Sequence, residues 1–261
     1  MTRKIVLHTF GLTATLLPFA LLVLGAMSSD SAIARLDFGS ASFANLLSNI
    51  QPSIWQALTN SFVICIPMVL LQIGSSILAA YAFAYFDFKR KQLLFSLLIF
   101  SYLLPAVATM LPLFFVMTAL GLKGSPAGIL LPFVLFSPYA VVLLRERFEA
   151  IPRELIDQGR IDGLSTWGIL VSVVAPLSRS FIGLLGLITF VSTWNAYLWP
   201  RLIAGTDFPT VTVAIGALQG QYDSHWNLVL SATLLAVIPA LTSFAIAGRS
   251  LVRNPLEEID I

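Results

Sequence analysis

The stretch RELIDQGRIDGLSTWG, residues 153–168, is the most polar part of an otherwise apolar chain. The chain has only two histidines, His8 and His225, and one cysteine, Cys65. A catalytic nucleophile needs an adjacent base, and a metal centre needs several ligands. We therefore expect no catalytic residue and no metal site, and assign the stretch to ionic and hydrogen-bonded contact with another surface. Its charged residues fill half of ten positions: Arg153, Glu154, Asp157, Arg160 and Asp162.

Local signals predict a short helix over residues 152–162, roughly 16 Å long at 1.5 Å per residue. Pro152 suits the first turn, where its missing N–H costs nothing. Glu154 places negative charge near the helix N-terminus, which the helix dipole favours. Gly163 fits a left-handed stop after the last turn. Ser165 or Thr166 then caps a second helix.

Amino-acid composition indicates the kind of protein to which this helix belongs. The chain is 57% hydrophobic and 11% charged, whereas soluble domains are about 25% charged. So much apolar surface indicates an all-α integral membrane protein.

Six charge-free stretches are each long enough for a membrane-spanning helix, which needs roughly 20 residues. The first could also be a cleaved signal peptide, but the apolar region of such a peptide is about 7–15 residues, so we interpret it as a retained helix. Residues 163–178 are uncharged but short and contain Pro176, and we interpret them as an interfacial helix leading into the fifth span. We expect one transmembrane domain over 1–261, with spans at about 5–27, 60–83, 93–119, 127–144, 180–199 and 228–248.

Loop charges predict the orientation. With six spans, 12 of the 15 basic residues fall on the side of the two termini and 3 on the other. Positive loops stay in the cytoplasm. Both termini and the loop 145–179 are therefore expected to be cytoplasmic. A seventh span over 163–178 would place Arg249 and Arg253 outside, against this rule.

The predicted spans carry no Asp, Glu, Lys or Arg in their middle. Ion-coupled carriers usually hold ionisable groups at membrane depth. The chain also has no G-x-x-x-x-G-K-[ST] phosphate loop, so we expect it to bind no ATP and no other cofactor. The residues alone support two interpretations of helix 152–162 equally. It could belong to a solvated cytoplasmic loop that packs on the protein's own helices, or it could be a docking helix for a soluble partner.

The segment AIPRELIDQGRIDGLSTWGILVSVVAPLSRS resembles the EAA loop of permease subunits of ABC importers, E-A-A-x-x-D-G-A. Asp157 stands at the Glu position, Gln158 and Gly159 at the Ala positions, and Asp162 and Gly163 at Asp-Gly. FDFKRKQLLF, LLPAVATMLPLFFVMTALGL, WNAYLWP and FPTVTVAIGALQGQY are similar to the carbohydrate-uptake branch. The DQG in place of EAA and the ending RSLVRNPLEEIDI depart from the family pattern.

The resemblance implies a bacterial inner-membrane importer for a sugar or glycerol-phosphate-like solute. A second permease subunit, a different chain, completes the pore, an extracytoplasmic binding protein delivers solute, and two ATPase subunits bind ATP and Mg. The EAA helix would couple to the ATPase. Gly159 would let it seat closely, and Asp162 would accept backbone N–H bonds at a turn in which Gly163 supplies positive φ. The expected coupling residues are Glu154, Asp157, Gly159, Arg160, Asp162 and Gly163.

The solute path is expected near the outer end of the fifth span, at Trp194, Asn195 and Tyr197, where an amide can meet sugar hydroxyls. Trp199 is interpreted as part of the aromatic belt at the membrane interface. Two alternatives remain open: a self-sufficient secondary carrier or channel, and a membrane scaffold without transport. No nucleic-acid partner is expected; the other partner is the lipid bilayer.

Overall fold

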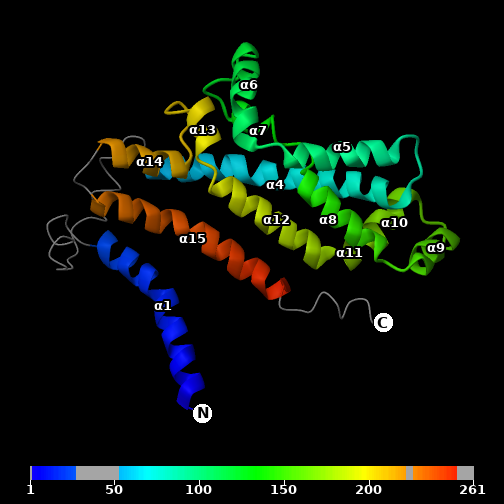
Figure 1. Cartoon of the computed structure of the whole chain (residues 1–261), viewed down its shortest axis with the longest axis horizontal. Coiled ribbons are helices and arrows are strands. Elements are labelled where there is room, and N and C mark those ends of the chain that lie inside the picture. The colour runs from blue at the N-terminus through cyan, green and yellow to red at the C-terminus, as the bar shows by residue number, and fades with distance from the viewer. Residues whose placement is uncertain (1, 28–52, 222–225, 252–261) are drawn as a thin grey trace. The chain divides into compact units, whose positions relative to one another are not determined.

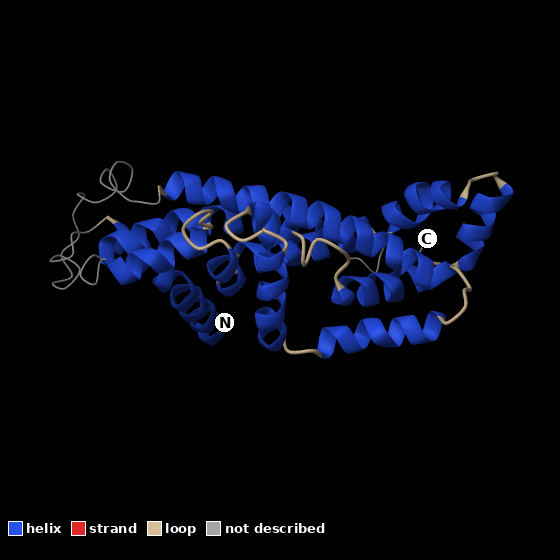
Figure 2. Cartoon of the chain, turned by 90° about the horizontal axis from the view of Figure 1, so that it is seen from above, coloured by secondary structure: helices blue, strands red, loops and turns tan. Residues whose placement is uncertain are grey.

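The computed structural model describes residues 2–27, 53–221 and 226–251. Every regular element in these ranges is a helix (Figure 2), which agrees with the predicted all-α class. The chain forms two compact units, one of residues 1–61 with 208–241 and one of residues 62–207 with 242–261.

The first unit contains α1 (Thr2–Ala26), the start of α4 (Ile54–Tyr85), α14 (Val211–Gln221) and most of α15 (Trp226–Leu251). Buried side chains join its segments by hydrogen bonds. The Ser231 hydroxyl donates to the carbonyl of Ala26 at 2.8 Å, and the Asn60 amide donates to the carbonyl of Pro209 at 3.0 Å. Polar groups removed from water are thus paired, as they must be.

The second unit holds the rest of α4 and the helices between it and residue 207 (Figure 1). Its core joins α4, α8, α9, the α10–η1 segment and α12, and includes Tyr81, Phe148, Ile156, Ile169 and Leu185. The elements are α5 (Lys91–Leu103), α6 (Ala106–Ala119), α7 (Pro126–Leu130), α8 (Pro138–Glu149), α9 (Arg153–Ile161), α10 (Thr166–Ile169), the π-helix η1 (Leu170–Val174), α11 (Ala175–Leu177), α12 (Arg179–Trp194) and α13 (Leu198–Ile203).

Among the described residues, two continuous helices are long and apolar enough to cross a membrane: α4 and the stretch Trp226–Ile246 of α15. They match the predicted second and sixth spans. In α1, the described apolar stretch is Thr15–Ala26, which is too short to cross a membrane by itself.

The stretch predicted as the third span, 93–119, consists of two helices. α5 and α6 meet at an angle of 97°. Leu104 is extended, with φ −67 and ψ 131, because the ring of Pro105 disfavours the helical conformation in the residue before it. Pro105 also lacks the N–H that would continue the helix.

The stretch predicted as the fourth span, 127–144, is also interrupted, because the chain between α7 and α8 is not helical. Pro132 and Pro138 lie at this break. Two polar side chains of α4 satisfy its backbone: the Gln72 amide donates to the carbonyl of Phe133 at 2.6 Å, and the N–H of Ser137 donates to the Ser76 hydroxyl at 3.0 Å. Irregular backbone persists in apolar surroundings only where protein groups satisfy it in this way.

The predicted fifth span, 180–199, ends early, since α12 stops at Trp194 and α13 begins at Leu198. Before α12, the predicted interfacial helix is present as α10, η1 and α11, and it meets α12 at 80°. At this bend a guanidinium Nη2 of Arg147 donates to the carbonyl of Leu177 at 2.9 Å. After α12, the chain forms α13 and α14.

Candidate functional site

Helix α9 is the helix that the sequence predicts over 152–162, with bounds one residue inside at each end. Pro152 precedes its first residue in an extended conformation, with φ −53 and ψ 131. Glu154 lies in the first turn and Arg160 in the last, the arrangement that the helix dipole favours. These local signals set the helix length as expected.

The C-terminus of α9 closes in a Schellman motif. Gly163 has φ +81, in the left-handed region. Its N–H donates to the carbonyl of Arg160 at 3.1 Å, and the N–H of Leu164 donates to the carbonyl of Gly159 at 2.9 Å. This is the bond pattern of a glycine-terminated helix, and it confirms the predicted conformation of Gly163.

The cap of the next helix is also confirmed. The Ser165 hydroxyl accepts the N–H of Gly168 at 3.1 Å and so begins α10. The expected role of Asp162 was wrong, since its carboxylate is exposed and accepts no hydrogen bond within the described part of the chain. Backbone bonds alone close the turn.

The two faces of α9 differ sharply. Ile156 is 3% exposed and Gly159 is buried. A Cβ on Gly159 would lie 3.4 Å from Leu164 and 3.6 Å from Ile169. The expectation that Gly159 seats the helix against a partner was therefore wrong: the glycine lets α9 approach α10 and η1 of its own chain.

The outer face of α9 carries the charged residues and the apolar side chain of Ile161, which is 85% exposed. In α10, Trp167 is 62% exposed. Asp157 and Arg160 form an exposed ion pair at 3.0 Å, of the kind that contributes little to stability. Sequence reasoning missed Ile161, although it lies five positions after the buried Ile156, on the opposite side of a helix.

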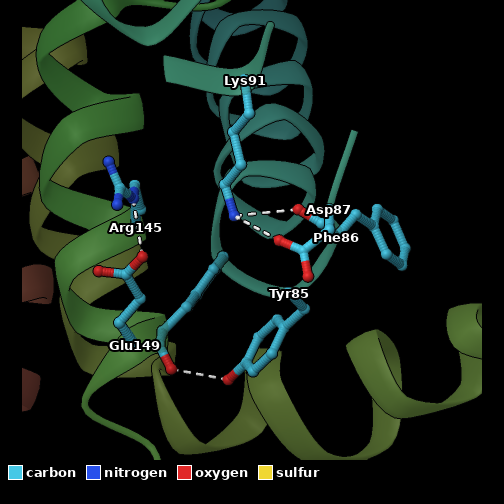
Figure 3. Close-up of polar contacts among 7 residues, drawn as sticks. Tyr85, Phe86, Asp87, Lys91, Arg145 and Glu149 are labelled. Carbon is cyan, nitrogen blue, oxygen red and sulfur yellow. Dashed lines mark hydrogen bonds and ion pairs between the residues drawn. The ribbon is translucent and has the colours of Figure 1, made fainter. Parts of the chain in front are cut away.

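A polar cavity of about 410 Å³ opens between α9 and the ends of α4 and α8. Beside it, Arg145 pairs with Glu149 at 2.8 Å, and Lys91 lies 3.9 Å from Asp87 (Figure 3). Acidic and basic groups are equal in number on its walls, so it suits a partner surface of mixed charge rather than a single anion. The charged lining residues are Asp87, Lys91, Glu149, Arg153, Asp157 and Arg160.

The expected solute-path residues lie at the end of α12, but they do not share one environment. Trp194 is 2% exposed and stacks on Phe190 with ring centroids 5.5 Å apart. Asn195 is exposed and its amide donates to the carbonyl of Val191 at 2.8 Å. Tyr197 is exposed. The side chains of Asn195 and Tyr197 are thus exposed, whereas that of Trp194 is packed inside the protein.

Trp199 was expected at the membrane interface and is instead 5% exposed. Its ring meets Phe133 edge-on, at 5.7 Å and 89°. Phe133 lies in the irregular segment between α7 and α8, and the course of this segment places its ring against Trp199. The sequence does not predict that course. Among the described residues no group of three or more His, Cys, Asp or Glu could hold a metal ion.

Comparison with known families decides what kind of protein carries this site. The family described as "Binding-protein-dependent transport system inner membrane component" matches residues 72–254. The chain belongs to this family. As an inner membrane component of a transport system it is a transport subunit rather than an enzyme, and its match includes α9 and the cavity beside it.

Curated relatives of this inner membrane component are permeases. The lactose transport system permease protein LacG of Rhizobium radiobacter is 30% identical over 249 residues, covering 94% of this chain and 91% of the relative. The sn-glycerol-3-phosphate transport system permease protein UgpE of Shigella flexneri serotype 5b is 34% identical over 203 residues, which cover 77% of this chain and 72% of the relative.

Solved structures share the fold. A chain in the crystal structure of a bacterial ABC transporter involved in the import of the acidic polysaccharide alginate matches with a TM-score of 0.78 at 21% identity, covering 95% of this chain and 94% of that one. The alginate transporter in complex with an alginate pentasaccharide-bound periplasmic protein matches with a TM-score of 0.66 at 13% identity, covering 94% and 93%.

Proposed function

We propose that this chain is one of the two membrane-spanning subunits of an ATP-driven importer for a sugar or a glycerol-phosphate-like solute. The family assignment and the resemblance to lactose and sn-glycerol-3-phosphate permeases support this solute class. Two ATPase subunits would bind ATP and Mg, a different permease chain would complete the pore, and an extracytoplasmic binding protein would deliver the solute. The absence of a phosphate loop from the sequence fits this division of labour.

We propose six spans in the bacterial inner membrane, with both termini and the loop 145–179 in the cytoplasm. The two compact units would then work as one transmembrane domain. The basic residues, 12 of 15 on the proposed cytoplasmic side, support this orientation. The helix pair bent at Pro105 would be one broken span rather than a straight one, while α10, η1 and α11 would lie at the cytoplasmic interface and lead into the fifth span, α12.

The single observation that carries the coupling proposal is the two-faced character of α9. Its inner face is fixed to the chain through Ile156 and Gly159, while Ile161 on its outer face is 85% exposed. An apolar centre with a polar rim is the usual anatomy of a protein interface, and we propose Ile161 as that centre, with the charged residues around it as the rim. Glu154, Asp157, Arg160 and Asp162 would make the polar rim of the ATPase contact, and Gly163 would hold the helix end in shape.

For the solute path, Asn195 and Tyr197 are the proposed contact residues. The Asn195 amide needs only to exchange its intrahelical bond for a solute hydroxyl. Trp194, held in the stack with Phe190, would keep the end of α12 rigid.

The test is co-purification of the chain with its ATPase, followed by ATPase measurements over a panel that includes lactose and sn-glycerol-3-phosphate. The variant Ile161→Asp places a charge in the proposed apolar contact and should lose the ATPase. Ile161→Val keeps an apolar side chain and should retain it. Retention of the ATPase by Ile161→Asp would contradict the proposed contact.

A further inference from the structure

Two tyrosines of α4, Tyr81 and Tyr85, reach the two segments that flank α9. They lie four positions apart and therefore on one face of the helix, with ring centroids 5.2 Å apart. The Tyr81 hydroxyl donates to the carbonyl of Thr166 at 3.1 Å. The Tyr85 hydroxyl, shown in Figure 3, donates to the carbonyl of Phe148 at 2.6 Å. One tyrosine thus holds the chain just before α9 and the other holds it just after.

Tyr81 lies in the core of the second unit, and Tyr85 packs against that core. Tyr81 is 6% exposed and packs in the same core as Phe148 and Ile156. Tyr85 is half-buried and lines the polar cavity beside α9. Both bonds are part-buried, so the core shields them from water in part.

Neither bond is needed to satisfy its carbonyl. The Phe148 oxygen also accepts the N–H of Ile151 at 3.2 Å, and the Thr166 oxygen also accepts the N–H of Leu170. A carbonyl oxygen has two lone pairs, and the tyrosines use the second. Removing the hydroxyls should therefore leave α8 and α10 intact while it cuts their connection to α4.

We propose that Tyr81 and Tyr85 are positioning residues that make α4 move together with α9. Apolar contacts let packed helices slide, whereas a hydrogen bond weakens steeply when its distance or angle changes. Two such bonds, one on each side of α9, resist both translation and rotation of α9 against α4. This inference rests on the proposed coupling of α9 to an ATPase, and it names α4 as the first spanning helix to receive the motion.

The experiment uses the complete importer in proteoliposomes and compares the double variant Tyr81→Phe with Tyr85→Phe against the wild type. Phenylalanine keeps the ring contacts, so the variant removes the hydroxyls alone. The matched control is Tyr102→Phe, whose ring stacks on Tyr139 and whose exposed hydroxyl makes no hydrogen bond with any described residue. The readout is the number of solute molecules imported per ATP hydrolysed, with the panel solute that best stimulates the wild type.

We expect the double variant to co-purify with the ATPase and to keep basal ATP hydrolysis. Its import per ATP should fall by about fivefold or more, the lower end of ordinary coupling between sites. Tyr102→Phe should behave as the wild type. Unchanged import per ATP in the double variant would overturn the inference, as would loss of the ATPase from the complex. A wild-type complex without solute-stimulated hydrolysis would instead contradict the proposed function itself.

Discussion

At the scale of single residues, Gly163 is a position where the backbone conformation itself disfavours any side chain. Its φ of +81 lies in the left-handed region, and nothing lies within 4 Å of an added Cβ. A substitution there is thus opposed by backbone strain alone, which costs roughly 1–2 kcal/mol for an L-residue and more for a β-branched one.

Gly163→Val should therefore unwind the last turn of α9 and lower solute uptake by about fivefold or more, while the chain still inserts in the membrane. Gly163→Asn is the matched comparison, because asparagine tolerates the left-handed conformation at a helix end. Uptake and membrane content are measured together. Normal uptake by Gly163→Val would show that the Schellman turn plays no part in transport.

At the scale of elements, the bend between α11 and α12 depends on a side chain from α8. The guanidinium of Arg147 donates to the carbonyl of Leu177 at 2.9 Å, next to Ser178, which is 1% exposed. The bend interrupts the helical hydrogen bonds, so no backbone N–H of a continuing helix reaches this carbonyl. The Arg147 guanidinium supplies the donor instead.

Replacing Arg147 with Met keeps a long apolar stem and removes the donor, which should cost about 1.5–3 kcal/mol. We expect a lower unfolding temperature for the purified chain in detergent. Arg201→Met, at an exposed position in the last turn of α13, is the control and should unfold like the wild type. Equal unfolding temperatures for both variants would mean that the bend is stable without Arg147.

The elements also show what the sequence can predict. α9 was predicted almost to the residue because its signals, Pro152, Glu154 and Gly163, act on the backbone within one or two helical turns. The breaks in the third and fourth spans were missed because an apolar run looks the same whether it is straight or bent. Whether a proline kinks or ends a helix depends on distant groups that satisfy the freed backbone, here Gln72 and Ser76 of α4.

The candidate site was predictable in its location but not in its faces. The sequence places five charges in residues 153–162, and all five side chains are exposed. It does not show that Gly159 faces inward, because that depends on how Leu164 and Ile169 fold back on α9. The tyrosine contacts escaped prediction for the same reason, since Tyr81 and Thr166 lie 85 positions apart.

At the scale of the whole molecule, sidedness is testable with single cysteines in a Cys65→Ala background. An impermeant maleimide applied to spheroplasts should label Lys123→Cys, in the turn between α6 and α7. Two other variants should be labelled only after the membrane is opened: Gln158→Cys, on the exposed face of α9, and Arg253→Cys. Labelling of Arg253→Cys in intact spheroplasts would favour seven spans over six.

The central claim is that this chain moves solute with energy that another protein supplies. The most direct measurement is uptake of labelled solute into proteoliposomes that hold either this chain alone or the chain with the partner permease, ATPase and binding protein. Our account predicts uptake only by the complete set, and only with ATP. Uptake by the chain alone, without ATP, would contradict it and identify a self-sufficient carrier or channel.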